Sequence, residues 1–477
     1  MSDAVGILPL AVAAGGGTID GIPAAGWVAA GVHLVQRSAP LVRALMGRRA
    51  AIMLPTSPAF FTALAACDGR GTVLVNPLAA TPEIAHQLAD ADVGAVFTTT
   101  ALASRLPAGT PHVLLDDAPR TARVVLGAGA PRDVDLVAHG GLRLDAEDDV
   151  PGRDEEAAIV YTSAMAGTPL GAILTHRNLI ANARSTMAAA ALTPHDHSLA
   201  VLPFSHLFGL VVGGLAPLLA GGRVTTMARF NPTRALDRLE QGDITFLTAV
   251  PAVFAGMVSV LERRGATRLD ALRVVICGGA PLDHALQDRW AELTGTEMRQ
   301  GYGLTEAGPV CLFNPLDRPN CRGSIGVPFP GVEVAIHDPD HRTPVADDTP
   351  GEICVRGDNV FRGYVSGGAN GLAVRDGWLH TGDLGVRRAD GTFLFSGVLK
   401  AMFTRNGYNI YPRELERVIA AMPGVRSVRV RGVPDAMREH QIAADVVGDV
   451  TEADVAAWCA ERMATYKQPN AITIGGA

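Results

Sequence analysis

Lysine is almost absent from this sequence of 477 residues. Lysine and arginine together number 41, yet only Lys400 and Lys467 are lysines. Any cationic site earlier in the chain must therefore use arginine or function without a fixed side-chain cation. The chain also lacks an excess of positive charge, with a net charge of -7 and a pI near 6.0. Because nucleic-acid binding usually needs a basic surface, this balance argues against nucleic acid as the main partner.

Cysteine is sparse and shows no spacing typical of a metal site. The six cysteines are Cys67, Cys277, Cys311, Cys321, Cys354 and Cys459, with no CxxC pair and no Cys/His pattern typical of zinc. We expect reduced, mostly buried thiols and a reducing, cytoplasmic setting.

Long apolar runs are lacking as well. The longest, "LFGLVVGGLAPLLAGG" at residues 207–222, is shorter than the roughly 20 residues that a membrane-spanning helix needs, and it contains glycine and proline. The N-terminal apolar stretch has no positive charge ahead of it, so a signal peptide is not indicated. The sequence therefore predicts a buried helix over 207–222 and no membrane span.

The pattern that is present predicts an α/β protein. Residues 50–140 alternate strand-like runs such as "RAAIMLP" and "VGAVFTT" with helix-like stretches, and "LAVLPF", "ITFLTAV" and "LRVVICGGA" continue the alternation. This predicts doubly wound α/β lobes, with a small β unit from about residue 320, where the segments become short and rich in glycine and proline. A small α+β domain follows, and we expect domains at 1–399 and 400–477.

The stretch "YTSAMAGTPLGAILTH", residues 161–176, follows a strand-like run and precedes a helix-like one. Strand, small-residue turn and helix in this order can cradle an anion with backbone N–H groups. The GxxxxGK[ST] pattern is absent, so an ordinary crossover turn, with Thr175 capping the next helix, is the alternative.

Four further segments follow the loop along the chain, and their order is characteristic of one enzyme superfamily. They are "CGGAPL" at 277–282, "GYGLTEAG" at 301–308, "GWLHTGDLG" at 377–385 and "NGYNIYPRELE" at 406–416. Together with the loop, they resemble the adenylate-forming superfamily of acyl-CoA synthetases, from about residue 50 to about residue 470. The resemblance implies a large N-terminal domain and a small mobile C-terminal domain. It also implies two half-reactions: an acid and ATP form an acyl-adenylate, and coenzyme A then takes the acyl group.

The resemblance carries functional roles onto individual residues. It implies catalytic roles for His206, Thr305, Glu306 and the hinge residue Lys400, with Glu306 as a Mg²⁺ ligand if the metal is used. It implies that AMP is held by Gly278, Gly279, Ala280, Gly301, Tyr302, Gly303, Thr305 and Asp383. It implies an acyl pocket of His206, Phe208, Gly209, Val250, Gly303 and Val310, and a coenzyme A tunnel of His206, Gly407 and Tyr408.

The phosphate loop departs from the family pattern. It keeps Thr162, Ser163 and Gly167, but Ala164, Met165, Ala166 and Leu170 stand where a glycine, two threonines and a lysine are expected. Val398 replaces an arginine near the hinge, and the resemblance places the family's last catalytic lysine beyond Ala477. Each charge-assisted hydrogen bond to a phosphate is worth about 1.5–3 kcal/mol, and such losses rarely add fully. Losing two lysine contacts and two threonine hydroxyls therefore removes on the order of 5–8 kcal/mol from the adenylation transition state. That corresponds to roughly four to six powers of ten in rate.

We therefore predict a ligase specialised for the second half-reaction, which uses a preformed acyl-adenylate and coenzyme A and releases AMP. This combination resembles the non-adenylating ligases of natural-product biosynthesis, which implies a bulky terpenoid acid and a separate adenylating ligase as partner. Two alternatives stay open. One is a complete ATP-dependent ligase in which arginines replace the missing lysines, and the other is an inactive relative that only binds a nucleotide or a partner protein.

Overall fold

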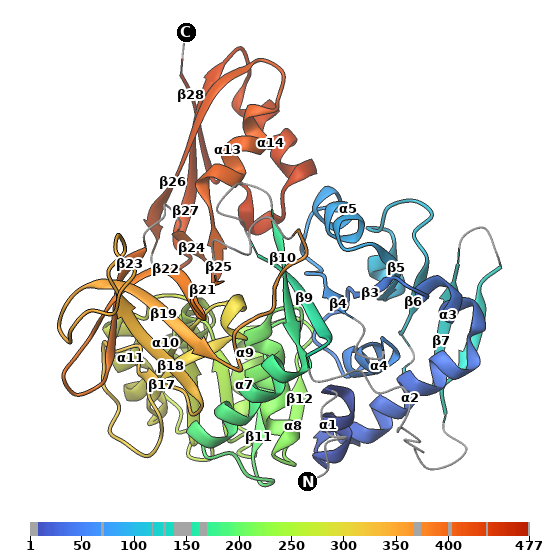
Figure 1. The fold of residues 1–477 in the computed structure, drawn as a ribbon, viewed down its shortest axis with the longest axis horizontal. Helices are drawn as coiled ribbons and strands as arrows, with labels where there is room; N and C mark the ends of the chain where they lie inside the picture. Colours follow the sequence, from blue (N-terminus) through green and yellow to red (C-terminus); the bar gives the residue numbers. More distant parts are fainter. Residues whose placement is uncertain are drawn as a thin grey trace.

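The computed structural model describes residues 8–67, 71–116, 118–126, 130–137, 154–162, 169–366, 374–398, 403–435 and 437–475. Most of the described chain is built from two nine-stranded sheets with helices packed around them (Figure 1). The predicted boundary between residues 399 and 400, the hinge candidate Lys400 and the loop residues Ser163, Ala164, Met165, Ala166 and Gly167 lie outside the described residues.

The first nine-stranded sheet carries the parallel strands that end at the candidate site. Its order is β17(Val327–Pro328), β16(Val310–Phe313), β15(Met298–Gly303), β14(Val274–Cys277), β13(Phe246–Ala249), β11(His197–Ala200), β12(Arg223–Thr226), β1(Thr18–Ile19) and β2(Ile22–Pro23). Strands β12, β11, β13, β14 and β15 are parallel, as the run of strand and helix signals predicts.

The second nine-stranded sheet forms most of the N-terminal lobe. Its order is β20(Gly363–Tyr364), β10(Leu170–Thr175), β9(Glu156–Thr162), β4(Thr72–Leu74), β3(Arg49–Ile52), β5(Val93–Thr98), β6(His112–Leu114), β7(Thr121–Val125) and β8(Arg132–Asp135). Its central strands are parallel, and apolar residues such as Ile52, Val73 and Phe97 are buried between the helices on either face.

The helices connect these strands and bury the sheet faces. In chain order they are α1(Leu8–Ala14), α2(Ala24–Arg37), α3(Ala39–Leu45), α4(Ala59–Ala66), α5(Thr81–Asp90), α6(Thr100–Ala103), α7(His176–Ala189), the π-helix η2(Phe208–Leu215), α8(Ala216–Leu219), α9(Pro232–Leu239), α10(Pro251–Arg264), α11(His284–Thr294) and the short 3-10 helix η3(Thr305–Ala307). The apolar run at 207–222 is a buried helical segment, as expected, with its first part wound as a π-helix. Among the described helices, none combines the length and apolar character that crossing a bilayer requires.

The small β unit predicted after residue 320 is a five-stranded antiparallel sheet. It joins β18(Val332–His337), β19(Gly351–Gly357), β22(Trp378–Arg387) and β21(Val374–Arg375), and β23(Phe393–Val398) pairs with β22. Because β22 is long, its first half reaches the edge of the parallel sheet where the candidate site lies.

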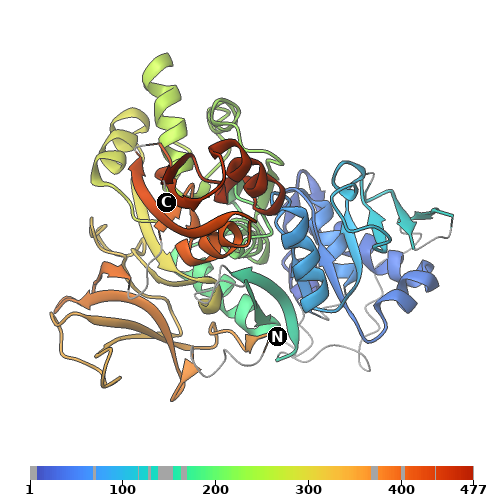
Figure 2. The same ribbon diagram turned by 90° about the horizontal axis from the view of Figure 1, so that it is seen from above.

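The C-terminal unit has its own sheet and core. It contains the hairpin β24(Phe403–Arg405) and β25(Tyr408–Ile410), the sheet β26(Val425–Asp435), β27(Glu439–Gly448) and β28(Ala471–Gly475), the helices α13(Pro412–Ala420) and α14(Glu452–Arg462), and the 3-10 helix η5(Thr465–Lys467). Its core is separate from the large cores of the lobes and includes Leu415, Ile442 and Val455. Figures 1 and 2 show this unit, in red, above the junction between the N-terminal lobe and the rest of the chain.

The reading of residues 161–176 as strand, turn and helix is wrong in one respect. A second strand, β10, runs antiparallel to β9 before the helix begins, so the loop joins two strands and not a strand to a helix. The run "LGAILT" pairs with β9 because its apolar and β-branched residues suit a buried strand. Thr175 does cap α7, since its Oγ1 accepts the Asn178 backbone N–H at 3.2 Å. The α7 N-terminus therefore lies at the far end of β10 from the loop.

Candidate active site

A cavity of about 820 Å³ lies where the parallel strands β11, β13, β14 and β15 reach their carboxyl ends. Ligands bind at this edge in open α/β sheets because the loops that leave the strands diverge there. The cavity walls come from both lobes, from the first half of β22, and from the β24–β25 hairpin of the C-terminal unit.

The structure brings most of the predicted site residues to this one cavity. Those that line it are Thr162, Leu170, His206, Phe208, Gly278, Gly279, Ala280, Gly301, Tyr302, Gly303, Thr305, Glu306, Val310, Asp383, Gly407 and Tyr408. Gly209 and Val250 are buried outside the lining set. Gly303 shows why a small residue is needed here, since a Cβ would lie 1.9 Å from the Pro309 carbonyl oxygen.

Tyr302 and Asp383 form a buried pair in the cavity wall. The Tyr302 hydroxyl donates a hydrogen bond of 2.6 Å to Asp383 Oδ2. Burial raises the pKa of Asp383 to about 6, against the hydrogen bond from Tyr302, and the nearby Glu306 and Glu352 raise it further. A carboxylate held in this way favours ligands that bring additional hydrogen-bond donors.

Glu306 is the second buried acid in the cavity. Its Oε1 accepts the Tyr364 hydroxyl at 2.8 Å and the Thr162 hydroxyl at 3.4 Å. Burial raises the pKa of Glu306, and these hydrogen bonds only partly oppose the change. Its carboxylate, with the Thr162 hydroxyl beside it, is a suitable oxygen ligand set for Mg²⁺, which would neutralise negative charge on a phosphate.

His206 lines the cavity as a neutral imidazole. Burial lowers the pKa of His206 to about 4. Its Nδ1 accepts the backbone N–H of Phe208 at 3.2 Å, which assigns the proton to Nε2. In this tautomer, His206 can donate a hydrogen bond to a ligand through Nε2, but it has no lone pair there with which to act as a base.

At the end of the cavity where the phosphate loop begins, the side chain that replaces the expected lysine is apolar. Leu170 lies at the start of β10, pairs with Thr162 of β9 and lines the cavity. Among the described residues that line the cavity there is no arginine. The alternative in which arginines replace the missing lysines therefore has no support from the described lining.

The C-terminal unit contacts the N-terminal part of the chain at this cavity. Gly407, in the turn of the β24–β25 hairpin, has a φ of 77°, and a Cβ there would lie 2.7 Å from Val250 Cγ1. The next residue, Tyr408, stacks on Tyr466 with ring centroids 4.0 Å apart. Glycine at position 407 thus permits both the left-handed turn and the close approach of the two units.

Lys467 also joins the two units. Its Nζ donates to Glu414 Oε1 at 2.6 Å within the C-terminal unit and to Glu83 Oε1 at 2.8 Å on α5. Burial alone would lower the pKa of Lys467, but Tyr466, Glu414 and Glu83 outweigh it and hold this pKa above its usual value. The ammonium of the one lysine in the described part of the chain is therefore committed to two carboxylates.

Several lining residues were missed by the sequence analysis, and the tyrosines share a signal that could have found them. The chain has only six tyrosines, and all of them line the cavity: Tyr161, Tyr302, Tyr364, Tyr408, Tyr411 and Tyr466. Tyrosine occurs in three of the matched segments, those at 161–176, 301–308 and 406–416, and a scarce residue type that recurs in this way deserves weight as a site marker. Glu83 and Glu352 carry no comparable local signal.

Comparison with known proteins tests the resemblance. Residues 42–365 match the AMP-binding enzyme family, and residues 414–475 match the AMP-binding enzyme C-terminal domain. A feruloyl-CoA synthase from Amycolatopsis sp is 34% identical over 442 residues, which cover 89% of this chain and 84% of that protein. The chain belongs to the AMP-binding enzyme family. The predicted adenylate-forming superfamily of acyl-CoA ligases is thereby confirmed, together with the predicted fold class.

Two solved relatives show the same fold in different liganded states. This AMP-binding enzyme is similar to a malonyl-CoA ligase in a ternary product complex with methylmalonyl-CoA and AMP, with a TM-score of 0.81, 27% identity and coverage of 97% of this chain and 95% of that one. It is also similar to MatB from Rhodopseudomonas palustris bound to ATP, with a TM-score of 0.68, 28% identity and coverage of 96% and 91%.

Proposed function

We propose that this enzyme transfers an acyl group from a preformed acyl-adenylate to the thiol of coenzyme A, with adenylation by ATP lost or very weak. The observation that carries the proposal is the composition of the cavity wall. Leu170 lines it where the family uses a lysine, and among the described lining residues Lys467 is the only lysine or arginine.

The charge balance of the wall supports the proposal. Glu83, Glu306, Glu352 and Asp383 line the cavity, whereas the Lys467 ammonium is already hydrogen-bonded to two carboxylates. ATP and departing diphosphate carry several negative charges, and each charge-assisted hydrogen bond to them is worth about 1.5–3 kcal/mol. Mg²⁺ held by Glu306 would neutralise part of that charge, but it would not replace the side-chain contacts on the diphosphate.

Binding the AMP part of an acyl-adenylate requires different side chains, and the cavity contains a candidate for each contact. We assign Asp383 to the two ribose hydroxyls, Tyr302 to the adenine ring, and the glycine-rich segment at 278–280 to the wall against the base. The raised pKa of Asp383 fits this role, because a buried carboxylate is stabilised by donors that the ribose supplies. Thr305 is assigned to the α-phosphate.

The acyl end of the cavity is apolar. Its lining includes Phe208, Val212, Ile276, Val310, Phe313 and Phe329. These side chains favour an apolar acid, because burying the acyl chain against them removes apolar surface from water. The bulky terpenoid acid implied by the sequence resemblance is compatible with this wall, and so is a hydroxycinnamic acid.

The arrangement of the C-terminal unit fits the thioester-forming step. Gly407 packs against Val250 and Tyr408 lines the cavity, so the β24–β25 hairpin is positioned to form one side of a pantetheine tunnel.

In the proposed reaction the thiolate sulfur attacks the acyl carbonyl carbon. A C–S bond forms, the C–O bond to the phosphate breaks, and AMP leaves with the electron pair of that bond. A thiol with a pKa near 8.5 needs only orientation and a proton acceptor such as water or the leaving phosphate. His206 would donate from Nε2 to the carbonyl oxygen as negative charge develops there, in place of acting as a base.

A complete ATP-dependent ligase is the second candidate function. The similarity to a relative solved with bound ATP favours it. An acid-dependent exchange of labelled pyrophosphate into ATP separates the two. We expect no exchange above background with hydroxycinnamic, fatty or diterpenoid acids, and release of AMP when one of the corresponding synthetic acyl-adenylates is supplied with coenzyme A. Exchange driven by any of these acids would contradict the proposal, and absence of AMP release with every adenylate would favour an inactive relative.

A further inference from the structure

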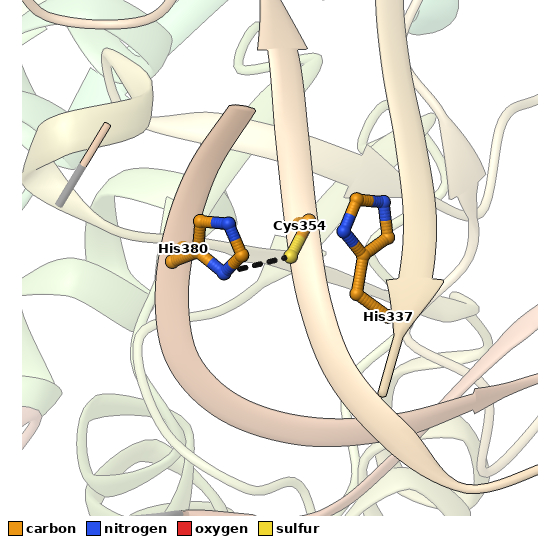
Figure 3. A group of neighbouring side chains, drawn as sticks. All are labelled: His337, Cys354 and His380. Carbon is orange, nitrogen blue, oxygen red and sulfur yellow. Dashed lines mark hydrogen bonds between the residues drawn. The ribbon is translucent and has the colours of Figure 1, made fainter. Parts of the chain in front are cut away.

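Three side chains with metal-binding donor atoms meet in the five-stranded sheet, and one of them, His380, also lines the cavity. His337 ends β18, Cys354 lies on β19 and His380 lies on β22. Figure 3 shows the Cys354 thiol between the two imidazoles. One donor atom from each residue lies within 4.8 Å of the other two.

The strand register accounts for this meeting. Cys354 pairs with His380 across β19 and β22, and His337 pairs with Glu352 across β18 and β19. Because residues two apart on a strand point to the same face, Glu352 and Cys354 project together. Four donors from three neighbouring strands therefore share one face of the sheet, although no two of them are adjacent in sequence.

The cluster is buried, and its hydrogen bonds are incomplete. His337 is 2% exposed and Cys354 is 0% exposed. Neither ring nitrogen of His337 makes a hydrogen bond of normal geometry within the described part of the chain, although the Arg342 backbone interacts weakly with the ring. A buried imidazole costs free energy when its nitrogens are left without partners, so this arrangement calls for a ligand between the side chains.

The distances suit a tetrahedral cation. Bond lengths of about 2.3 Å to sulfur and 2.0–2.1 Å to imidazole nitrogen place two zinc ligands about 3.4–3.6 Å apart. Cys354 Sγ lies 3.4 Å from His380 Nδ1. Small rotations of the imidazole rings would bring the His337 nitrogen to a similar distance from the other two donor atoms. Glu352 Oε2 lies 2.8 Å from the same His380 nitrogen and is the nearest further donor.

We infer that His337, Cys354 and His380 bind a borderline-soft divalent cation, with Zn²⁺ as the expected ion and Glu352 completing the set. Two imidazoles and a thiolate select such a cation over Mg²⁺ or Ca²⁺, which prefer oxygen ligands. Cys354 binds as the thiolate, so loading releases its proton to solvent and weakens as the pH falls.

A cation at this site would hold the neighbouring cavity wall in place. Glu352 Oε1 accepts the Gly382 backbone N–H at 2.8 Å, and the Thr381 hydroxyl donates to the Ile353 carbonyl at 2.8 Å. These contacts hold the segment of β22 that ends at Asp383. A cation bound to His380 and Glu352 would fix this segment relative to β18 and β19, whether or not adenylation is retained.

The direct test uses cobalt as a spectroscopic probe on the full-length protein without a polyhistidine tag. After chelator treatment and dialysis, titration with Co²⁺ is expected to give about one tightly bound ion per chain, with the intense visible bands of tetrahedral cobalt and a sulfur-to-cobalt charge-transfer band. Added Zn²⁺ should displace the cobalt and raise the melting temperature.

Two variants and two matched controls locate the site. Cys354→Ala should abolish the charge-transfer band, and His337→Phe, which keeps a ring against Trp378, should weaken Co²⁺ binding at least about tenfold. Metal-free His337→Phe should melt no lower than the wild type, because it removes a buried imidazole whose nitrogens lack hydrogen bonds of normal geometry. Cys459→Ala and His112→Gln change another buried thiol and another histidine, and should leave the cobalt spectrum unchanged.

The wild-type spectrum alone can overturn the inferred metal site, without any variant. A titration that shows no stoichiometric cobalt and no sulfur-to-cobalt band overturns the inference. Equal binding by wild type, Cys354→Ala and His337→Phe would overturn it as well, because the ion would then be held elsewhere. Neither result would bear on the proposed acyl transfer, which is measured by AMP release.

Discussion

The two ends of the cavity differ in what they can hold. At one end, Tyr302 and Asp383 form a buried, hydrogen-bonded pair suited to a nucleoside. At the other, Leu170 stands beside Thr162, and among the described lining residues no arginine is found. The fold is that of the whole family, so the difference rests on a few side chains. Under the proposed function, one fold keeps one half-reaction while the groups needed for the other are replaced.

The largest expected effect comes from removing the carboxylate at the nucleoside end. Asp383→Asn should lower thioester formation from acyl-adenylate and coenzyme A by about 10- to 100-fold, the loss expected for hydrogen bonds to a charged group. Initial rates at subsaturating adenylate measure it. Asp390→Asn, an exposed carboxylate in the turn after β22, is the control. A variant as active as the wild type would contradict the assignment of Asp383 to the ribose.

Unfolding is not expected to explain that loss. The folded protein raises the pKa of Asp383 from 3.8 to about 6, so it favours the protonated carboxyl. This contribution to stability is present below about pH 3.8 and is lost as the pH rises through about 6. A neutral asparagine therefore removes a cost at pH 7, and thermal melting at that pH should show no loss of stability.

A gain of function at the phosphate end of the cavity would test the same difference between the two ends. Leu170→Lys places an ammonium where the family has one, and it should increase acid-dependent ATP consumption by about 10- to 100-fold. Leu170→Met, of similar length and without charge, should not. If both variants behave alike, or if lysine has no effect, the diphosphate end is not limited by the missing cation.

A smaller effect is expected where the two units touch. Gly407→Ala adds a methyl group 2.7 Å from Val250 Cγ1 at a left-handed position, so it should hinder the close approach of the hairpin. We expect a loss of about tenfold in the thiolation rate from roughly 1–2 kcal/mol of strain. The second change Val250→Ala should restore part of the rate by removing the clash. No recovery would mean that the turn conformation alone is responsible.

An effect of similar size is expected in the pH dependence of nucleoside binding. Adenosine, which has no phosphate to titrate, should bind about tenfold more tightly at pH 7 than at pH 5, because the Asp383 carboxylate ionises as the pH rises through its value near 6. Calorimetric titration measures the affinity. In Asp383→Asn the affinity should not vary over this range, and a wild-type profile that is equally flat would contradict the role of the carboxylate.

Local patterns predicted much of the fold. The runs "RAAIMLP" and "VGAVFTT" became β3 and β5, and the apolar run at 207–222 became the buried helical segment of η2 and α8, because strand and helix signals are encoded within a few residues. The second strand of the hairpin at 156–175 was missed, since a small-residue turn followed by a short apolar run is equally typical of the approach to a helix.

Site residues that lie within a sequence motif were predicted. Those that only long-range packing brings to the site were missed. Tyr302, Asp383 and Gly407 were found because they lie within matched segments. Lys467 contacts Glu83 across 384 positions of sequence, and His337 meets Cys354 and His380 only through strand register. The scattered cysteines predicted no zinc site, and no spacing in the sequence could have predicted that cluster.

The central claim is that the enzyme holds an acyl-adenylate but is poorly able to make one. One preparation should be given coenzyme A with a synthetic acyl-adenylate in one reaction, and coenzyme A with the corresponding free acid, ATP and Mg²⁺ in another. With the acid whose adenylate reacts fastest, we predict thioester formation at least about 100-fold faster from the adenylate. Rates from the free acid and ATP that come within a few-fold of those from the adenylate would contradict the account.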